Sequence, residues 1–148
     1  MDKKQVGEIM TSPAIVVGPD MSVSAANALM REKSIRHLPV VDKGRLVGIV
    51  SRGDLREATF TEAVNADTYE LHFMLNRLTV ERLMTRRVYT ITADAPLVQA
   101  VELLNKHKIA SLPVVDAEGQ VIGIITESDL LKTLAHYLRQ LEATAEAA

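Results

Sequence analysis

A set of short motifs occurs twice along this 148-residue chain, and this internal repeat limits the possible folds more than any other feature. The repeated pieces are Met10-Thr11 with Met84-Thr85, residues 38–42 with 112–116, and residues 46–55 with 121–130. The spacing between copies is 74 residues for the first two pairs and 75 for the third, because the second copy has a one-residue insertion in a turn. The sequence therefore predicts two copies of one folded unit.

Each copy is predicted to contain a short turn, a strand, a helix, a two-stranded hairpin and a closing helix, in that order. The first helix shows helical spacing, since Val23, Ala26 and Met30 fall on one face. Pro96 suits the first turn of the matching helix, where a missing N–H has no cost. The predicted ranges are 6–10, 14–17, 22–33, 37–41, 46–51 and a helix from Arg52 in the first copy, and 80–84, 88–92, 96–107, 111–115, 121–126 and a helix from Glu127 in the second.

The repeats also define the predicted domain boundaries. The first repeat covers 1–61, a helical linker covers 62–79, the second repeat covers 80–136, and a tail covers 137–148. The linker has apolar residues on more than one face, so we expect it to pack on its own repeat and on a partner subunit. The tail offers little apolar surface, so we expect it to fray.

Composition and charge exclude several classes of function. With 47% hydrophobic and 24% charged residues, the chain is predicted to be a folded globular protein. The absence of cysteine excludes a disulfide framework and a thiolate nucleophile. A net charge of −2 and 3% aromatic residues argue against nucleic acid as the main partner. Neither a signal-peptide pattern nor an apolar run of membrane-spanning length occurs, so we expect a cytoplasmic protein with no membrane contact.

The sequence lacks the common catalytic and metal-binding motifs. The spacing of His37, His72, His107 and His136 does not match a metal site. Neither a Walker A motif nor Gly-x-Gly-x-x-Gly is present. We therefore expect no catalytic residues, no metal site and no required cofactor.

The closing motif of each copy places a hydroxyl residue three positions before an aspartate, at the junction of a strand and a helix. The two pairs are Ser51 with Asp54 and Thr126 with Asp129. One interpretation is a capping box with Asp in place of the usual Glu or Gln. The other is ligand binding, because free backbone N–H groups at a helix start attract phosphate. The two interpretations are compatible.

These motifs, in this order and present twice, resemble a pair of CBS domains, also called a Bateman module. The resemblance covers residues 6–134. The arrangement of the motifs is similar to that of stand-alone bacterial CBS-pair proteins, including the acetoin-utilisation-like ones. It implies an α+β fold in which two β-α-β-β-α repeats pack about a pseudo-twofold axis. It also implies two clefts that can take adenosine-containing ligands, namely AMP, ADP, ATP or S-adenosylmethionine.

The resemblance also implies which residues bind such a ligand. In the family, the aspartate of the closing motif holds the ribose hydroxyls, the Ser or Thr contacts phosphate or ribose, and the first strand and the segment before Leu-Pro hold the base. The implied residues are Ala14, Ile15, Val16, Ile35, Arg36, His37, Pro39, Ser51, Arg52 and Asp54 for the first site, and Val88, Tyr89, Ile109, Ala110, Pro113, Thr126 and Asp129 for the second.

The two implied sites differ in charge. The first has basic residues at Arg36, His37 and Arg52, whereas the second has Ala110 and Glu127 at matching positions. We therefore expect the first site to prefer a phosphorylated ligand, and the second to be weaker or to select a less anionic ligand such as an adenosyl group. Another interpretation of Arg36 and His37 is a solvated strand end.

Three functions compete at this stage. The first is a regulatory module that binds an adenosine nucleotide or S-adenosylmethionine and signals through a homodimer or an unidentified protein target. The second is a protein-interaction module with vestigial ligand sites. An enzyme is the least supported, because the catalytic domain that accompanies CBS pairs in some enzymes has no counterpart in this sequence.

Overall fold

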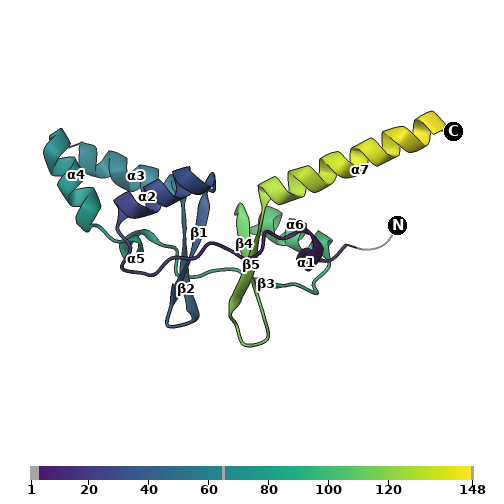
Figure 1. Cartoon of the computed structure of the whole chain (residues 1–148), viewed down its shortest axis with the longest axis horizontal. Coiled ribbons are helices and arrows are strands. Elements are labelled where there is room, and N and C mark those ends of the chain that lie inside the picture. The colour runs from purple at the N-terminus through teal and green to yellow at the C-terminus, as the bar shows by residue number, and fades with distance from the viewer. Residues whose placement is uncertain (1–3, 65, 148) are drawn as a thin grey trace. The chain divides into compact units, whose positions relative to one another are not determined.

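The computed structural model describes residues 4–64 and 66–147, which form two compact units (Figure 1). Of the described residues, unit 1 contains 4–14 and 89–147, and unit 2 contains 15–64 and 66–88. The predicted domain limits at residues 1 and 148, and position 65 within the predicted linker, lie outside the described residues. Both units mix helices with short strands, which confirms the α+β fold class.

Unit 2 contains a two-stranded antiparallel sheet. Among the described residues of this unit, one helix precedes the sheet in the sequence, and three helices follow it. Strands β1 (His37–Asp42) and β2 (Arg45–Ser51) form the predicted hairpin. Only Val17 of the predicted strand 14–17 pairs, through a parallel bridge to Val40. The helices are α2 (Val23–Lys33), α3 (Arg52–Ala63), α4 (Thr68–Arg77) and α5 (Val80–Leu83).

Unit 1 contains a three-stranded sheet in the order β3-β4-β5. Strand β3 (Ile91–Thr92) pairs parallel with β4 (Ser111–Val115), which pairs antiparallel with β5 (Val121–Thr126). The helices are α1 (Val6–Ile9), α6 (Leu97–His107) and α7 (Glu127–Ala147). The predicted helix starts are confirmed at Arg52 and Glu127, and the second hairpin has the predicted bounds.

The two short helices α1 and α5 do not belong to the compact unit of their own sequence repeat. Helix α1 belongs to the unit of the second repeat, where the N–H of Val6 donates to the carbonyl of Ala95 at 2.9 Å. Helix α5 belongs to the unit of the first repeat, where the N–H of Val80 donates to the carbonyl of Met21 at 2.9 Å. Val6 and Val80 are both fully buried. Each repeat therefore completes its core with the short helix that precedes the other repeat.

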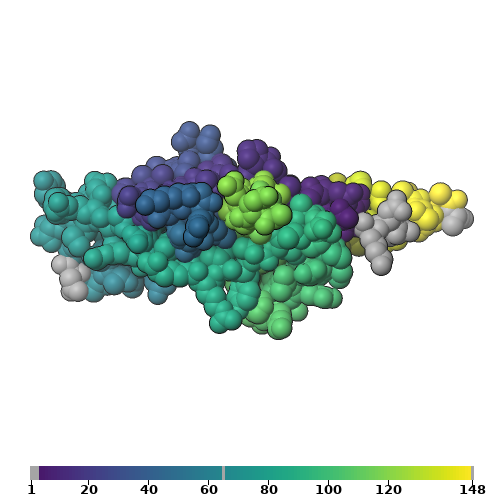
Figure 2. All heavy atoms as spheres, turned by 90° about the horizontal axis from the view of Figure 1, so that it is seen from below, coloured from purple at the N-terminus to yellow at the C-terminus, as the bar shows by residue number. Residues whose placement is uncertain are grey.

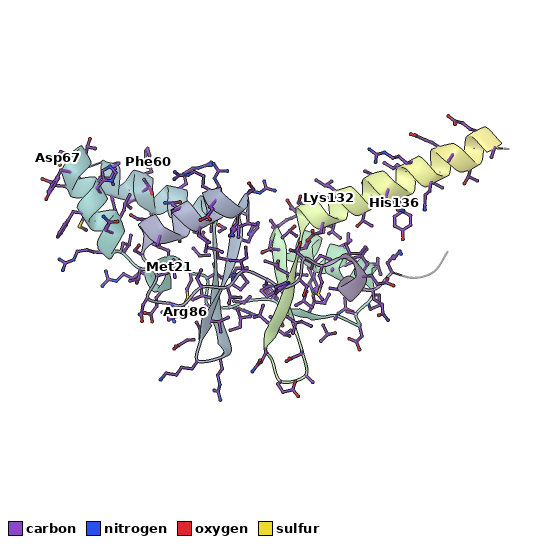
Figure 3. All side chains as sticks on the ribbon, viewed as in Figure 1. Met21, Phe60, Asp67, Arg86, Lys132 and His136 are labelled. Atoms are coloured by element: carbon purple, nitrogen blue, oxygen red, sulfur yellow. The ribbon has the colours of Figure 1, made fainter. Side chains whose placement is uncertain are left out.

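Two segments, the predicted helical linker and the predicted tail, both contain helix. The expected linker helix is divided, because α3 runs on to Ala63 and α4 starts anew after Asp67, whose carboxylate accepts from the N–H of Glu70 at 2.8 Å (Figure 3). The tail continues α7 to Ala147, and its fraying stays a prediction. Ala, Glu and Leu have high helix propensity, so a helix once started at Glu127 propagates through them. Within the described ranges, no helix is both long and apolar enough to cross a membrane.

Candidate functional site

The closing motif of unit 2 lies where β2 ends and α3 begins. The hydroxyl of Ser51 accepts from the N–H of Asp54 at 3.1 Å, and the Asp54 Oδ2 accepts from the N–H of Ser51 at 2.8 Å. These reciprocal bonds form a capping box, so the capping interpretation is correct at the local level. The second carboxylate oxygen of Asp54 accepts no hydrogen bond from the part of the chain that the structure describes. Asp54 can therefore cap the helix and still accept from a ligand.

The closing motif of unit 1 has the same location but more hydrogen bonds. The Asp129 Oδ2 accepts from the N–H of Thr126 at 2.9 Å and from its hydroxyl at 3.2 Å. The Asp129 Oδ1 accepts from the hydroxyl of Thr11 at 3.2 Å. Both carboxylate oxygens of Asp129 thus accept hydrogen bonds within the unit, whereas one oxygen of Asp54 has no donor among the described residues. The two motifs have similar sequences, but their aspartates differ in how many further hydrogen bonds they can accept from a ligand.

Thr11 is a residue that site prediction from the sequence missed. It lies 118 positions before Asp129, so no local pattern links the two. The available signal is the repeated Met-Thr pair, because Thr85 occupies the matching position in the second copy. Thr85 pairs through its backbone with Ile49 but forms no side-chain hydrogen bond within residues 4–64 and 66–147. The repeat therefore identifies the position but not the contact with the aspartate.

A basic pocket of about 790 Å³ lies between α2 and α3 in unit 2. Four arginines, Arg31, Arg36, Arg52 and Arg56, are among the residues that line it, and none of the described lining residues is Asp or Glu. Arg52 and Arg56 face the pocket together because residues four apart lie on one face of a helix. The N–H of Arg52 donates to the carbonyl of Arg36 at 2.8 Å, which fixes the two backbones beside each other. Such a cluster of like charges favours an anionic ligand.

The pocket brings together some of the predicted first-site residues and leaves out others. Ile35, Arg36 and Arg52 line it, whereas Ser51 and Asp54 are not among its lining residues. Arg31 and Arg56 were not predicted; the signal for Arg56 was its four-residue spacing from Arg52. His37 pairs across the hairpin with Ser51. This pairing keeps the first residue of β1 beside the start of α3.

The remaining predicted residues differ in exposure, and two of them, Ala14 and Val88, belong to the unit of the other predicted site. Val16 is 42% exposed, whereas Ile15 and Ile35 pack against the core of unit 2. Tyr89 stacks on His107 with ring centroids 3.8 Å apart, and Ile109 packs against the core of unit 1. The predicted residues Pro39 and Pro113 have fully buried side chains. Ala14 is half-buried, as is Val88, which ends unit 2, and the carbonyl of Ala110 accepts from the N–H of Glu127 at 3.0 Å.

No group of three or more metal-ligating side chains that could hold an ion occurs among the described residues. The chemistry that the two motifs offer is hydrogen bonding and charge. Carboxylates next to helix starts can accept from hydroxyls, and guanidinium groups can bind phosphate in a bidentate way.

The chain matches the family model of the CBS domain twice, over residues 6–60 and 80–136. A CBS domain-containing protein of Dictyostelium discoideum is 34% identical over 140 residues, covering 92% of this chain and 94% of that protein. The L-aspartate semialdehyde sulfurtransferase of Methanocaldococcus jannaschii is 32% identical over 126 residues. That alignment covers 84% of this chain and only 22% of the enzyme, so the chain spans about a fifth of its length.

Solved structures of similar proteins have the same fold. The CBS domain pair of protein MJ0100, in complex with 5′-methylthioadenosine and S-adenosyl-L-methionine, has a TM-score of 0.77 and 29% identity, covering 92% of this chain and 99% of that one. The putative acetoin utilization protein AcuB from Vibrio cholerae has a TM-score of 0.78 and 28% identity, with 96% and 98% covered. CBSX2 from Arabidopsis thaliana in complex with AMP has a TM-score of 0.74 and 34% identity, with 90% and 98% covered.

Proposed function

The chain belongs to the CBS domain family, and from that premise we propose that it is a regulatory module that binds an adenosine nucleotide (AMP, ADP or ATP) or S-adenosylmethionine. The observation that carries this proposal is the carboxylate of Asp54, which caps α3 with one oxygen, while the other accepts from no donor among residues 4–64 and 66–147. A carboxylate accepts well from vicinal ribose hydroxyls, and each hydrogen bond to a charged group contributes about 1.5–3 kcal/mol.

The first site is the one that we propose for a phosphorylated ligand. Its residues remain those implied by the family, with Ser51 and Asp54 at the ribose and Arg36 and Arg52 toward phosphate. The basic pocket supports this assignment, because it adds Arg31 and Arg56 to the two arginines. Guanidinium groups bind phosphate oxygens in a bidentate geometry that ammonium groups cannot match.

The second site is proposed to be weaker or to take an adenosyl group. A ligand that uses Asp129 as a ribose acceptor must share it with the donors of Thr126 and Thr11. Glu127 stands next to the motif and is exposed, so it disfavours phosphate there. The complexes of MJ0100 with S-adenosyl-L-methionine and of CBSX2 with AMP support both classes of ligand for a fold of this kind.

The response to the ligand is proposed to pass through a homodimer or a separate protein target in the cytoplasm, without catalysis by this chain. A ligand shifts such an equilibrium only by its difference in affinity for the two states. The similarity to the sulfurtransferase covers about a fifth of that enzyme. It therefore supports a CBS pair in this chain but does not support the reaction of the enzyme.

Isothermal titration calorimetry with AMP, ATP and S-adenosylmethionine tests the proposed function. Asp54→Ala is expected to weaken AMP and ATP binding by about tenfold or more, since one lost bond to a charged group amounts to about 1.4 kcal/mol or more. Asp129→Ala is expected to reduce AMP and ATP binding less than Asp54→Ala does.

The controls separate ligand binding from folding. Asp54→Asn keeps an acceptor for the capping box, so it retains the fold while removing the charge. Asp42→Ala removes an exposed aspartate of the same unit and is expected to leave affinity unchanged. Equal losses from the Asp54 and Asp129 variants would contradict the ranking of the sites. No heat with any of the three ligands would favour the interaction module with vestigial sites.

A further inference from the structure

The carboxylates of Asp54 and Asp129 differ in how many hydrogen bonds they can still accept from a ligand. An ionised carboxylate offers about four positions at which a donor can bind. Among the described residues, Asp54 uses one position, for the N–H of Ser51. Asp129 uses three, for the N–H and the hydroxyl of Thr126 and for the hydroxyl of Thr11. About three positions therefore remain on Asp54 and about one on Asp129.

The hydroxyl residues of the two motifs differ in the same direction. The Thr126 hydroxyl accepts from the N–H of Asp129 at 3.3 Å and donates to the Oδ2 of Asp129 at 3.2 Å. The Ser51 hydroxyl accepts from the N–H of Asp54 at 3.1 Å but donates to no acceptor within residues 4–64 and 66–147. Ser51 therefore keeps its hydrogen for a ligand oxygen, whereas Thr126 uses its hydrogen within the motif.

Thr11 is fixed where its hydroxyl meets Asp129. The N–H of Thr11 donates to the carbonyl of Ile124 at 2.8 Å, and its carbonyl accepts from the N–H of Ile124 at 2.9 Å. The next residue, Ser12, donates from its hydroxyl to the carbonyl of Ile122 at 2.8 Å. In Figure 2 the purple of this segment lies beside the light green of the β4–β5 hairpin. These hydrogen bonds to β5 hold the Thr11 hydroxyl within reach of Asp129.

The difference in free positions determines how each aspartate can bind a ribose. A ribose offers two adjacent hydroxyls, and both can donate to one carboxylate. Asp54 can accept both of them. Asp129 can accept one on its Oδ1, beside the Thr11 donor, and a second hydroxyl would have to displace Thr11. A hydroxyl that gains no acceptor adds little to affinity, so its removal from the ligand costs little.

We propose that Thr11 sets the ribose selectivity of the second site. The first site requires both ribose hydroxyls, whereas the second recognises one and therefore also takes adenosyl ligands that lack the other. This inference rests on the proposed function, because it assumes that both aspartates accept from ribose. It adds a positioning residue that acts through Asp129 and lies 118 positions before it in the chain.

Calorimetry on two backgrounds isolates the sites. Asp129→Ala leaves the first site, and Asp54→Ala leaves the second. Each protein is titrated with adenosine, 2′-deoxyadenosine and 3′-deoxyadenosine, and with the three corresponding monophosphates. At the first site, loss of either hydroxyl is expected to raise the dissociation constant about tenfold or more, because each bond to a charged group is lost in turn. At the second site, loss of only one of the two hydroxyls is expected to have this effect.

A second background protects the test against misfolding. If Asp54→Ala does not fold, Asp54→Asn replaces it, since the amide oxygen of Asn can still accept in the capping box while the charge is removed.

Thr11→Val in the Asp54→Ala background tests the role of Thr11 directly. The change removes a donor from Asp129, so the carboxylate regains a position for the second ribose hydroxyl. For the deoxy ligand that the second site tolerates, the ratio of its dissociation constant to that of the ribose ligand is expected to rise about tenfold. A purely structural effect of the substitution would weaken both ligands alike and leave this ratio unchanged.

Two control variants accompany Thr11→Val in the same background. Thr11→Ser keeps the hydroxyl and is expected to keep the original ratio. Thr85→Val changes the matching threonine of the other repeat, whose side chain makes no hydrogen bond within the described ranges, and is expected to leave the ratio unchanged.

The outcomes separate this inference from the proposed function. If both sites depend equally on both hydroxyls, or if Thr11→Val leaves the ratio unchanged, the inference is wrong while the proposed ligand class stands. If none of these nucleosides and nucleotides binds the wild-type protein, the proposed function is rejected, and the inference is rejected with it.

Discussion

At the scale of single residues, the most informative contrast is between Asp54 and Asp129. Both cap a helix from the same motif position, yet within the described ranges only Asp129 also accepts from hydroxyl groups, those of Thr126 and Thr11. The matching Thr85 makes no side-chain hydrogen bond within the described ranges. Two hydroxyl contacts therefore distinguish two aspartates that the sequence presents as equivalent, and the one from Thr11 comes from a distant part of the chain.

This contrast predicts unequal effects of two matched substitutions. Thr11→Val removes the donor to Asp129 while keeping a β-branched side chain, so it should lower the free energy of unfolding by about 1 kcal/mol. Thr85→Val should lower it by much less, because no side-chain hydrogen bond is lost. Urea denaturation of both variants checks the difference. Equal changes would show that the Thr11 contact contributes nothing.

At the scale of elements, glycines in two strands make room for methionines of the repeated Met-Thr motif. A Cβ added at Gly48 of β2 would overlap the side chain of Met84. A Cβ added at Gly123 of β5 would lie 2.7 Å from the Met10 sulfur and 2.9 Å from the carbonyl oxygen of Thr11. The backbone oxygen cannot move away as a flexible side chain can. The glycine that interrupts each strand therefore permits the close approach of a distant segment.

Gly123→Ala should consequently lower the free energy of unfolding by about 1–3 kcal/mol, as overpacking does. Gly18→Ala is the matched control, since an added Cβ at Gly18 meets nothing within 4 Å. Differential scanning calorimetry of the two variants measures the effect. A Gly123→Ala variant as stable as Gly18→Ala would mean that the Met10 segment shifts freely.

At the scale of the whole molecule, each compact unit is assembled from segments that lie far apart in the chain. Residues 1–14 complete the unit formed by 89–148, and α5 completes the unit formed by 15–88. Val6 and Val80 occupy matching positions of the repeat and are both fully buried, but in different cores. Each hydrophobic core thus contains a valine from the sequence repeat that forms the other unit.

Truncation of these two valines should act on opposite units. Val6→Ala is expected to cost about 2 kcal/mol and to weaken amide protection in residues 89–147, because the cavity forms in unit 1. Val80→Ala is expected to weaken protection in residues 15–88 instead. Hydrogen exchange by mass spectrometry distinguishes the two patterns. Loss of protection within the variant's own sequence repeat would contradict the exchanged short helices.

The sequence by itself determined the repeat, the hairpins, the helix starts and the family, because periodicity, turns and caps depend on residues close together in the chain. It also predicted Asp54 and Asp129 as ligand-binding residues through their motif, and this stays a prediction. Tertiary structure decided the exchange of α1 and α5, the bond from Thr11 to Asp129 and the pocket that joins Arg31 to Arg56. Each of these depends on partners that the folded chain alone brings together. A local pattern holds no information on which distant donor reaches a carboxylate or which helix fills a core.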